Sequence, residues 1–295
     1  MGNKDQTQKR LEDFSDIFAD IINALLFNGE EIIKADELET ITAKDTYTVE
    51  SKIHEIERDV AKRWKHNEIH LSLFGLENQT DPDPTMPMRV ICYDGSAYRA
   101  QLNKKTTKAH YPVITLVLYM DTEEHWNKPK RLIECFQVDK KLKRYVNDYK
   151  INVVELAWLS DKQIMKFKSE FRNFVELLRD TRLGRKPQYS PIQLKHVHEL
   201  LQLMRVMSGN NEYEKLLNNT HDIFQHTKIK GDELTMKKIV YYGFDEAAAK
   251  AQMKEKFATV KRMLKLGKSS LADISEITEL PLATVKEIQA EMHSL

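Results

Sequence analysis

The most constraining feature of this sequence is an almost continuously apolar segment at residues 111–120, YPVITLVLYM. Its many β-branched residues favour a strand. A strand with so few polar positions is typical of the centre of a sheet, where both of its faces are buried. The segment is far too short to cross a bilayer, so we expect no membrane partner.

The fold class follows from the segments around this strand. Helical character appears on both sides of it, and Asn28 and Gly29 mark the end of the first helix. We therefore expect an α/β fold: a central mixed sheet flanked by helices, followed by a helical C-terminal region. The helical segments are residues 11–27, 86–102, 162–181, 191–207 and 246–266.

The pattern changes near residues 180–190, where the sequence TRLGRKPQYSP interrupts the helical periodicity. We place a boundary there, between a mixed α/β module at residues 1–185 and a helical region at residues 186–295. Residues 269–292 resemble a helix-turn-helix hairpin built around a proline. This hairpin suits DNA contact, but it equally suits dimerisation or capping, so a homodimer stays open.

A second strand, at residues 69–79, has a candidate site at its end. Apolar and other side chains alternate from Ile69, as in a strand with one face in a core. If the strand continues, Glu77 and Gln79 point to one face and Asn78 to the other. A hairpin would bring Asp59, which precedes the strand, beside Glu77.

These residues suit metal-dependent hydrolysis of a phosphodiester. Asp59 and Glu77 offer the hard oxygen ligands that Mg²⁺ or Mn²⁺ prefers, and the backbone carbonyl of Asn78 offers a third. A bound cation would polarise the phosphate and activate a water molecule. Gln79 would orient that water, because an amide does not titrate and cannot act as the base.

Composition narrows the function further. Lys and Arg number 46 against 45 Asp and Glu, which argues against a wholly basic nucleic-acid coat but allows a local basic patch such as residues 140–144. The sequence has no Gly-rich phosphate loop, so no nucleotide cofactor is expected. The polar N-terminus shows no signal peptide. We expect a cytoplasmic protein whose two cysteines are reduced and buried.

Several segments in fixed order resemble the Rpn family of recombination-promoting nucleases and putative transposases, in the PD-(D/E)XK nuclease superfamily. The resemblance covers residues 12–160 and, more loosely, the helices that follow. It implies a Mg²⁺-dependent DNA endonuclease core, with metal ligands at Asp59 and Glu77 and with Gln79 at the superfamily's lysine position. Asn23 also matches. The segments are FADIINALLFNG, RDV, FGLENQT, DPTMPMRVICYDGSAYRAQL and YPVITLVLYM.

Two alternatives remain open. Arg89 suits a phosphate contact, but an ion pair with Asp83 or Asp94 is the commoner role for such a residue. The departure from lysine at Gln79 also supports a competing hypothesis, in which a degenerate nuclease fold acts as a scaffold for DNA or protein binding.

Overall fold

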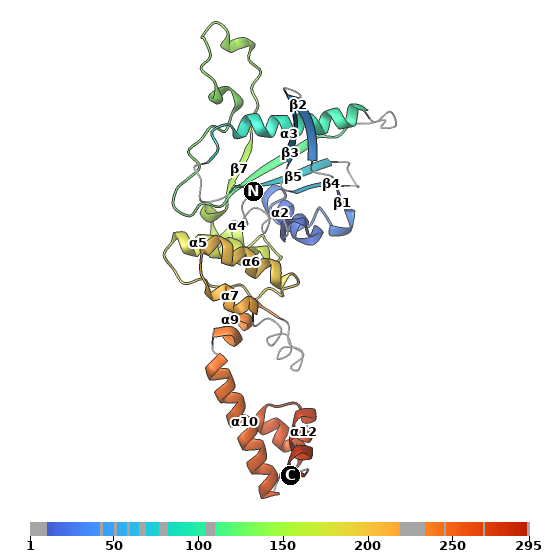
Figure 1. Ribbon diagram of the computed structural model, residues 1–295, viewed down its shortest axis with the longest axis vertical. Helices are drawn as coiled ribbons and strands as arrows, with labels where there is room; N and C mark the ends of the chain where they lie inside the picture. The colour runs from blue at the N-terminus through green and yellow to red at the C-terminus, as the bar shows by residue number, and fades with distance from the viewer. Residues whose placement is uncertain are drawn as a thin grey trace. The chain divides into compact units, whose positions relative to one another are not determined.

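The chain forms two compact units, Met1–Asn210 and Asn211–Leu295 (Figure 1). The predicted division at residues 185 and 186 into a nuclease core and a helical region stays a prediction. The computed structural model describes residues 11–41, 44–49, 52–57, 60–64, 69–76, 82–103, 110–218, 234–244, 246–267 and 269–293.

A five-stranded mixed sheet lies in the first unit, in the order β1-β4-β5-β6-β7. The first three strands pair antiparallel and the last three pair parallel. β6 is enclosed by β5 and β7, and its residues 116–119 are at most 1% exposed, which confirms the predicted buried strand. The strands are β1 (Leu38–Thr40), β4 (Val60–Trp64), β5 (Ile69–Leu76), β6 (Val113–Tyr119) and β7 (Asn152–Glu155).

A separate antiparallel hairpin precedes β4 in the chain. It consists of β2 (Lys44–Val49) and β3 (Lys52–Glu57).

Helices cover both faces of the five-stranded sheet (Figure 1). α3 (Met86–Asn103) packs on the face that holds Val117 and Tyr119. α2 (Ser15–Leu26) covers the other face, because Phe18 contacts Lys62, whose ladder partner pairs in turn with Ile114. The mixed α/β class and the helices predicted at residues 11–27 and 86–102 are therefore confirmed.

The predicted helix at residues 162–181 is wrong in one respect, because the chain breaks it in two. α4 (Asp161–Ile164) begins at Ser160, which caps it, and α5 (Phe171–Arg182) follows after an interruption. Asp20, on α2, accepts hydrogen bonds from the backbone N–H groups of Lys168 (2.8 Å) and Ser169 (2.9 Å). These donors are thus bonded to α2 instead of continuing a helix.

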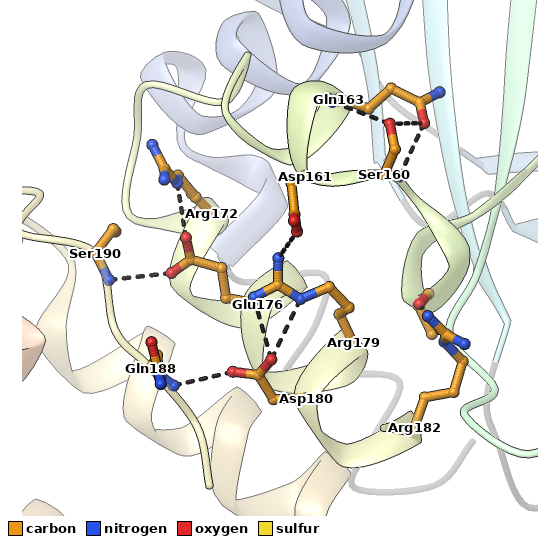
Figure 2. Close-up of polar contacts among 11 residues, drawn as sticks. Ser160, Asp161, Gln163, Arg172, Glu176, Arg179, Asp180, Arg182, Gln188 and Ser190 are labelled. Atoms are coloured by element: carbon orange, nitrogen blue, oxygen red, sulfur yellow. Dashed lines mark hydrogen bonds and ion pairs between the residues drawn. The ribbon is translucent and has the colours of Figure 1, made fainter. Parts of the chain in front are cut away.

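Polar side chains of α5 hold the segment that follows it (Figure 2). Asp180 is 2% exposed, accepts a hydrogen bond from the backbone N–H of Gln188 (2.9 Å) and pairs with Arg179 (3.1 Å). Glu176 accepts a hydrogen bond from the backbone N–H of Ser190 (3.0 Å). Both buried carboxylates have partners, as the cost of an isolated buried charge demands. This network is structural.

One further helix and four short turns complete the described part of the first unit. α6 (Val197–Ser208) packs against α5. Short 3₁₀ turns lie at η1 (Ala35–Glu37), η2 (Leu132–Cys135), η3 (Lys143–Tyr145) and η4 (Leu156–Trp158).

The prediction that both cysteines are buried is wrong. Cys92 is exposed and Cys135 is half-buried, and both are free thiols. Cys92 lies on the solvent-facing side of α3, so its side chain is exposed although its neighbours in the sequence are apolar.

The second unit is helical. α10 (Glu246–Leu266), α11 (Leu271–Thr278) and α12 (Leu282–His293) share a core, and α10 confirms the helix predicted at residues 246–266. The core residues are Val260, Ile274, Leu280, Val285 and Ile288. α7 (Glu212–Asn218) and α9 (Met236–Phe244) precede them. Within the described parts of the chain, no helix is both long and apolar enough to span a membrane.

Candidate functional site

The carboxyl ends of the three parallel strands lie side by side. Leu76 of β5 pairs with Tyr119 of β6, and Tyr119 pairs with Glu155 of β7. We refer to the row formed by these three residues as the carboxyl edge. Ligands of open α/β sheets bind in crevices outside such carboxyl ends. This edge is therefore the place in the first unit where a site is most expected.

The antiparallel pairing of β4 and β5 brings the start of β4 to the same edge. Val60, the first residue of β4, pairs with Leu73, and β5 continues to Leu76. The hairpin that the sequence predicted between these strands is thus present. Four predicted site residues lie outside the described residues: Asp59, Glu77, Asn78 and Gln79.

Asn23 has a structural role that replaces its expected DNA contact. It lies on α2 and is 6% exposed. Its Nδ2 donates to the carbonyl of Ile33 (2.8 Å), and its Oδ1 accepts from the backbone N–H groups of Ile32 (3.2 Å) and Ile33 (2.9 Å). A buried amide with both ends bonded inside the protein cannot contact a DNA strand. Its function is to hold the chain that follows α2.

Arg89 forms one of the two predicted ion pairs. Its Nη1 lies 3.0 Å from Asp83 Oδ2, and its Nη2 donates to the Tyr93 hydroxyl (3.2 Å). Burial by itself raises the pKa of Asp83, but hydrogen bonds from Thr85 and Arg89 outweigh it and hold that pKa below its ordinary value. The Arg89 side chain remains 44% exposed, so a phosphate contact stays a prediction.

Asp94 pairs differently from the alternative that the sequence left open. It is 2% exposed on α3 and accepts hydrogen bonds from the hydroxyls of Thr115 (2.6 Å) and Tyr149. Further along the same helix, the Tyr98 hydroxyl accepts from the backbone N–H of Val113 (3.1 Å). Gln101 bonds both backbone groups of Tyr111, at 2.9 and 3.0 Å.

Asp94, Tyr98 and Gln101 therefore dock α3 onto β6 and the residues that lead into it. Their spacing of four and three residues places them on one face of the helix, and this spacing is the signal from which a docking role could have been read. The Tyr-Asp-x-x-x-Tyr-Arg-x-Gln-Leu segment is thus at least partly a structural motif.

Sequence reasoning missed a polar group at the carboxyl edge. Glu155 lies 2.5 Å from His125 Nδ1 and 3.2 Å from Lys130 Nζ. Burial by itself raises the pKa of Glu155, but the hydrogen bonds from His125 and Lys130 outweigh it and lower that pKa. Asp121 follows β6 and accepts a hydrogen bond from the Tyr119 hydroxyl (3.0 Å). Only the strand register reveals that these residues are neighbours.

The carboxyl edge thus presents hard oxygen groups with a cation, Lys130, beside them, a combination suited to phosphate chemistry. Among the residues that the structure describes, no group of three or more His, Cys, Asp or Glu side chains could hold a metal ion. A metal site at this edge would therefore need ligands from the segments between the described residues.

Comparison with known proteins relates the first unit to a family. The sequence model of a family described as "Putative transposase, YhgA-like" matches residues 14–212. That range includes the five-stranded sheet, α2 to α6 and the carboxyl edge. No curated protein and no solved structure matches the chain.

Proposed function

The chain belongs to the YhgA-like putative transposase family, and on this premise we propose that it is a Mg²⁺- or Mn²⁺-dependent DNA endonuclease with a PD-(D/E)XK-like core. It would hydrolyse phosphodiester bonds during recombination or the movement of mobile elements. Asp59 and Glu77 are the proposed metal ligands, and DNA is the proposed partner.

One observation supports the proposal most. β4 begins and β5 ends at the same edge of the sheet, as their antiparallel register requires. Asp59 directly precedes the first residue of β4, and Glu77 directly follows the last residue of β5. We therefore propose that both side chains reach the carboxyl edge, where Glu155 and Asp121 lie.

The register of β4 and β5 also sets a condition on how Asp59 and Glu77 could share one metal ion. Paired residues share a face, and faces alternate along each strand, so regular alternation would send the residue before Val60 and the residue after Leu76 to opposite faces. A shared ion requires this alternation to break once, between Asp59 and Val60 or between Leu76 and Glu77. Such irregularities are common next to active sites.

The residues would divide the chemistry as follows. The Asp59 and Glu77 carboxylates and the Asn78 carbonyl would hold the cation against the edge of the sheet. When bound, the cation polarises the scissile phosphate and lowers the pKa of a water molecule. Gln79 would accept a hydrogen bond from that water and orient it. Arg89 would contact a neighbouring phosphate of the same strand.

The first prediction is tested by nicking of a supercoiled plasmid. Nicking should require Mg²⁺ and stop with EDTA. Asp59→Ala and Glu77→Ala should each reduce the rate by about 100-fold or more, because each removes a ligand of the ion that stabilises the transition state. Glu31→Ala removes an exposed carboxylate elsewhere in the first unit and should nick normally. Undiminished nicking by either folded site variant would reject the assignment.

A second candidate function is supported by Gln79, which lacks the positive charge that a lysine would add in the transition state. In that case the nuclease fold is a DNA- or protein-binding scaffold without activity. Wild-type protein that binds DNA but does not nick it with Mg²⁺ or Mn²⁺ would favour this scaffold over the nuclease.

A further inference from the structure

A long connection between β6 and β7 has features that the proposed function leaves unexplained. Residues 128–150, which we name the β6–β7 arm, extend away from the sheet beyond α3 (Figure 1). The base of the arm is closed by a bridge between Arg131 and Lys150 and by the hydrogen bond from Leu132 N–H to Tyr149 C=O (2.8 Å). Arg131 also pairs with Asp148 at 2.5 Å. Backbone hydrogen bonds and an ion pair therefore hold the two ends of the arm together.

This base is attached beside the proposed site. The chain enters the arm after β6, at the carboxyl edge. η2, within the arm, packs against α3, and the Cys135 thiol donates to the carbonyl of Pro84 (3.5 Å). Tyr149 donates to the buried Asp94 of α3. A strand of DNA bound at the carboxyl edge would therefore lie close to the base of the arm.

The tip of the arm is strongly basic. Lys140, Lys141, Lys143 and Arg144 are all exposed, and none forms an ion pair with any described carboxylate. The nearby Asp139 carboxylate accepts a hydrogen bond from the backbone N–H of Lys141 (2.8 Å) and forms no ion pair with the tip cations. Two cations at the base, by contrast, are paired: Arg131 with Asp148 and Lys130 with Glu155. Positive charge without internal partners is thus concentrated at the tip.

The tip also exposes apolar surface among these cations. Tyr145 is 67% exposed and Leu142 is 58% exposed. The Arg144 guanidinium lies 4.7 Å from the Tyr145 ring centroid and donates to its hydroxyl (2.6 Å). An exposed aromatic ring with a cation against it, in a basic setting, is the arrangement on which nucleic-acid bases stack.

We infer that the β6–β7 arm binds single-stranded DNA next to the cleavage site. The four tip cations contact phosphates, and the Tyr145 ring stacks on an unpaired base. The inference rests on the proposed function, because it takes DNA as the substrate. It adds a preference for substrates with unpaired nucleotides, such as forks and single strands, over continuous duplex.

The charge contribution is tested by fluorescence anisotropy with a labelled single-stranded oligonucleotide in EDTA, which prevents cleavage. The test variant replaces Lys140, Lys141, Lys143 and Arg144 with Ala. Each lost phosphate contact lowers the slope of log K against log salt by about 0.7 for a single strand, so the slope should fall by about 3. Binding at moderate salt should weaken by about tenfold or more.

The matched control has the same change in net charge at a distance from the arm. It replaces the exposed Lys34, Lys162, Arg185 and Lys186 with Ala. This control should keep most of the wild-type affinity and slope. Equal losses in the two variants would mean that only net charge matters, and would overturn the role of the arm.

The stacking contribution is tested with Tyr145→Ala and Tyr145→Phe. Loss of the ring should weaken single-strand binding by about fivefold or more and should affect continuous duplex much less. Tyr145→Phe keeps the ring and should bind normally. Unchanged single-strand binding by Tyr145→Ala would refute the stacking contact. The variants change only exposed side chains, so their melting temperatures should match the wild type.

These outcomes separate the two proposals. If wild-type protein binds no DNA, both proposals fail. If the quadruple arm variant binds and nicks like its control while Asp59→Ala and Glu77→Ala do not nick, the arm inference fails alone. If arm variants lose binding while the Asp59 and Glu77 variants nick normally, the arm inference stands and the proposed catalytic site fails.

Discussion

At the scale of single residues, the turn after α2 shows how one backbone position sets a local path. Gly29 has φ +86°, and a Cβ there would lie 3.0 Å from Lys166 Cβ. Both the left-handed backbone and the nearby side chain favour a residue without a Cβ. The sequence marked this position as a helix end, but only the structure shows its contact with the segment after α4.

Gly29→Ala should therefore destabilise the first unit by about 1–3 kcal/mol, from the strained φ and from displacement of Lys166. Gly184→Ala is the matched control, because Gly184 has φ +63° and a Cβ added there would meet no atom within 4 Å. Urea unfolding of both variants separates the two effects. An equal loss in both would show that the contact with Lys166 contributes nothing.

Glu155 supports a prediction on pH. Its pKa is lowered in the folded protein, because the hydrogen bonds from His125 and Lys130 outweigh the effect of burial. A lowered carboxyl pKa stabilises the fold above the ordinary value of 4.5, and this stabilisation is lost as the pH falls through the folded-state pKa.

Melting temperature measured from pH 6 downward should thus fall less steeply below about pH 4.5 in Glu155→Gln than in the wild type, because the amide does not titrate. Parallel curves for Glu155→Gln and wild type would show that Glu155 does not contribute to acid sensitivity.

At the scale of elements, α3 is held to the sheet by polar contacts as well as by its apolar face. Met86, Val90 and Tyr93 pack against β6, while Gln101 bonds both backbone groups of Tyr111. The backbone at Tyr111 leads directly into β6. α3 and β6 are thereby fixed in register with each other.

Gln101→Leu should destabilise the first unit by about 1–3 kcal/mol, because it leaves a backbone N–H and C=O of Tyr111 without their partner. Gln137→Leu makes the same substitution at an exposed position and should change stability little. Urea unfolding compares the two. Equal stability of both variants would remove the docking role of Gln101.

Element prediction succeeded where local pattern decides structure and failed where a distant residue does. The buried strand β6 and the helices α2, α3 and α10 follow from apolar spacing alone. The helix expected at residues 162–181 is broken because Asp20, nearly 150 positions earlier in the chain, captures the backbone N–H groups of Lys168 and Ser169. No local pattern contains that information.

At the scale of the whole molecule, the candidate site depends on how strands are ordered. The sequence identified Asp59 and Glu77 by residue type and by their positions beside a strand. The order β4-β5-β6-β7 places Glu155 and the base of the β6–β7 arm at the same end of the sheet as the start of β4 and the end of β5. Proposed metal ligands, carboxyl-edge residues and proposed DNA-binding cations thus come from five separate stretches of the first unit.

The sequence by itself determined the α/β class, the family, the buried strand and most helices, because these depend on side chains close together in the chain. Tertiary structure alone decided the strand order, the burial of Asn23, the docking role of Gln101 and the separation of paired from unpaired cations in the arm. These features depend on contacts between residues that are distant in the sequence. Such residues come within hydrogen-bonding or ion-pairing distance only when the sheet and its covering helices assemble.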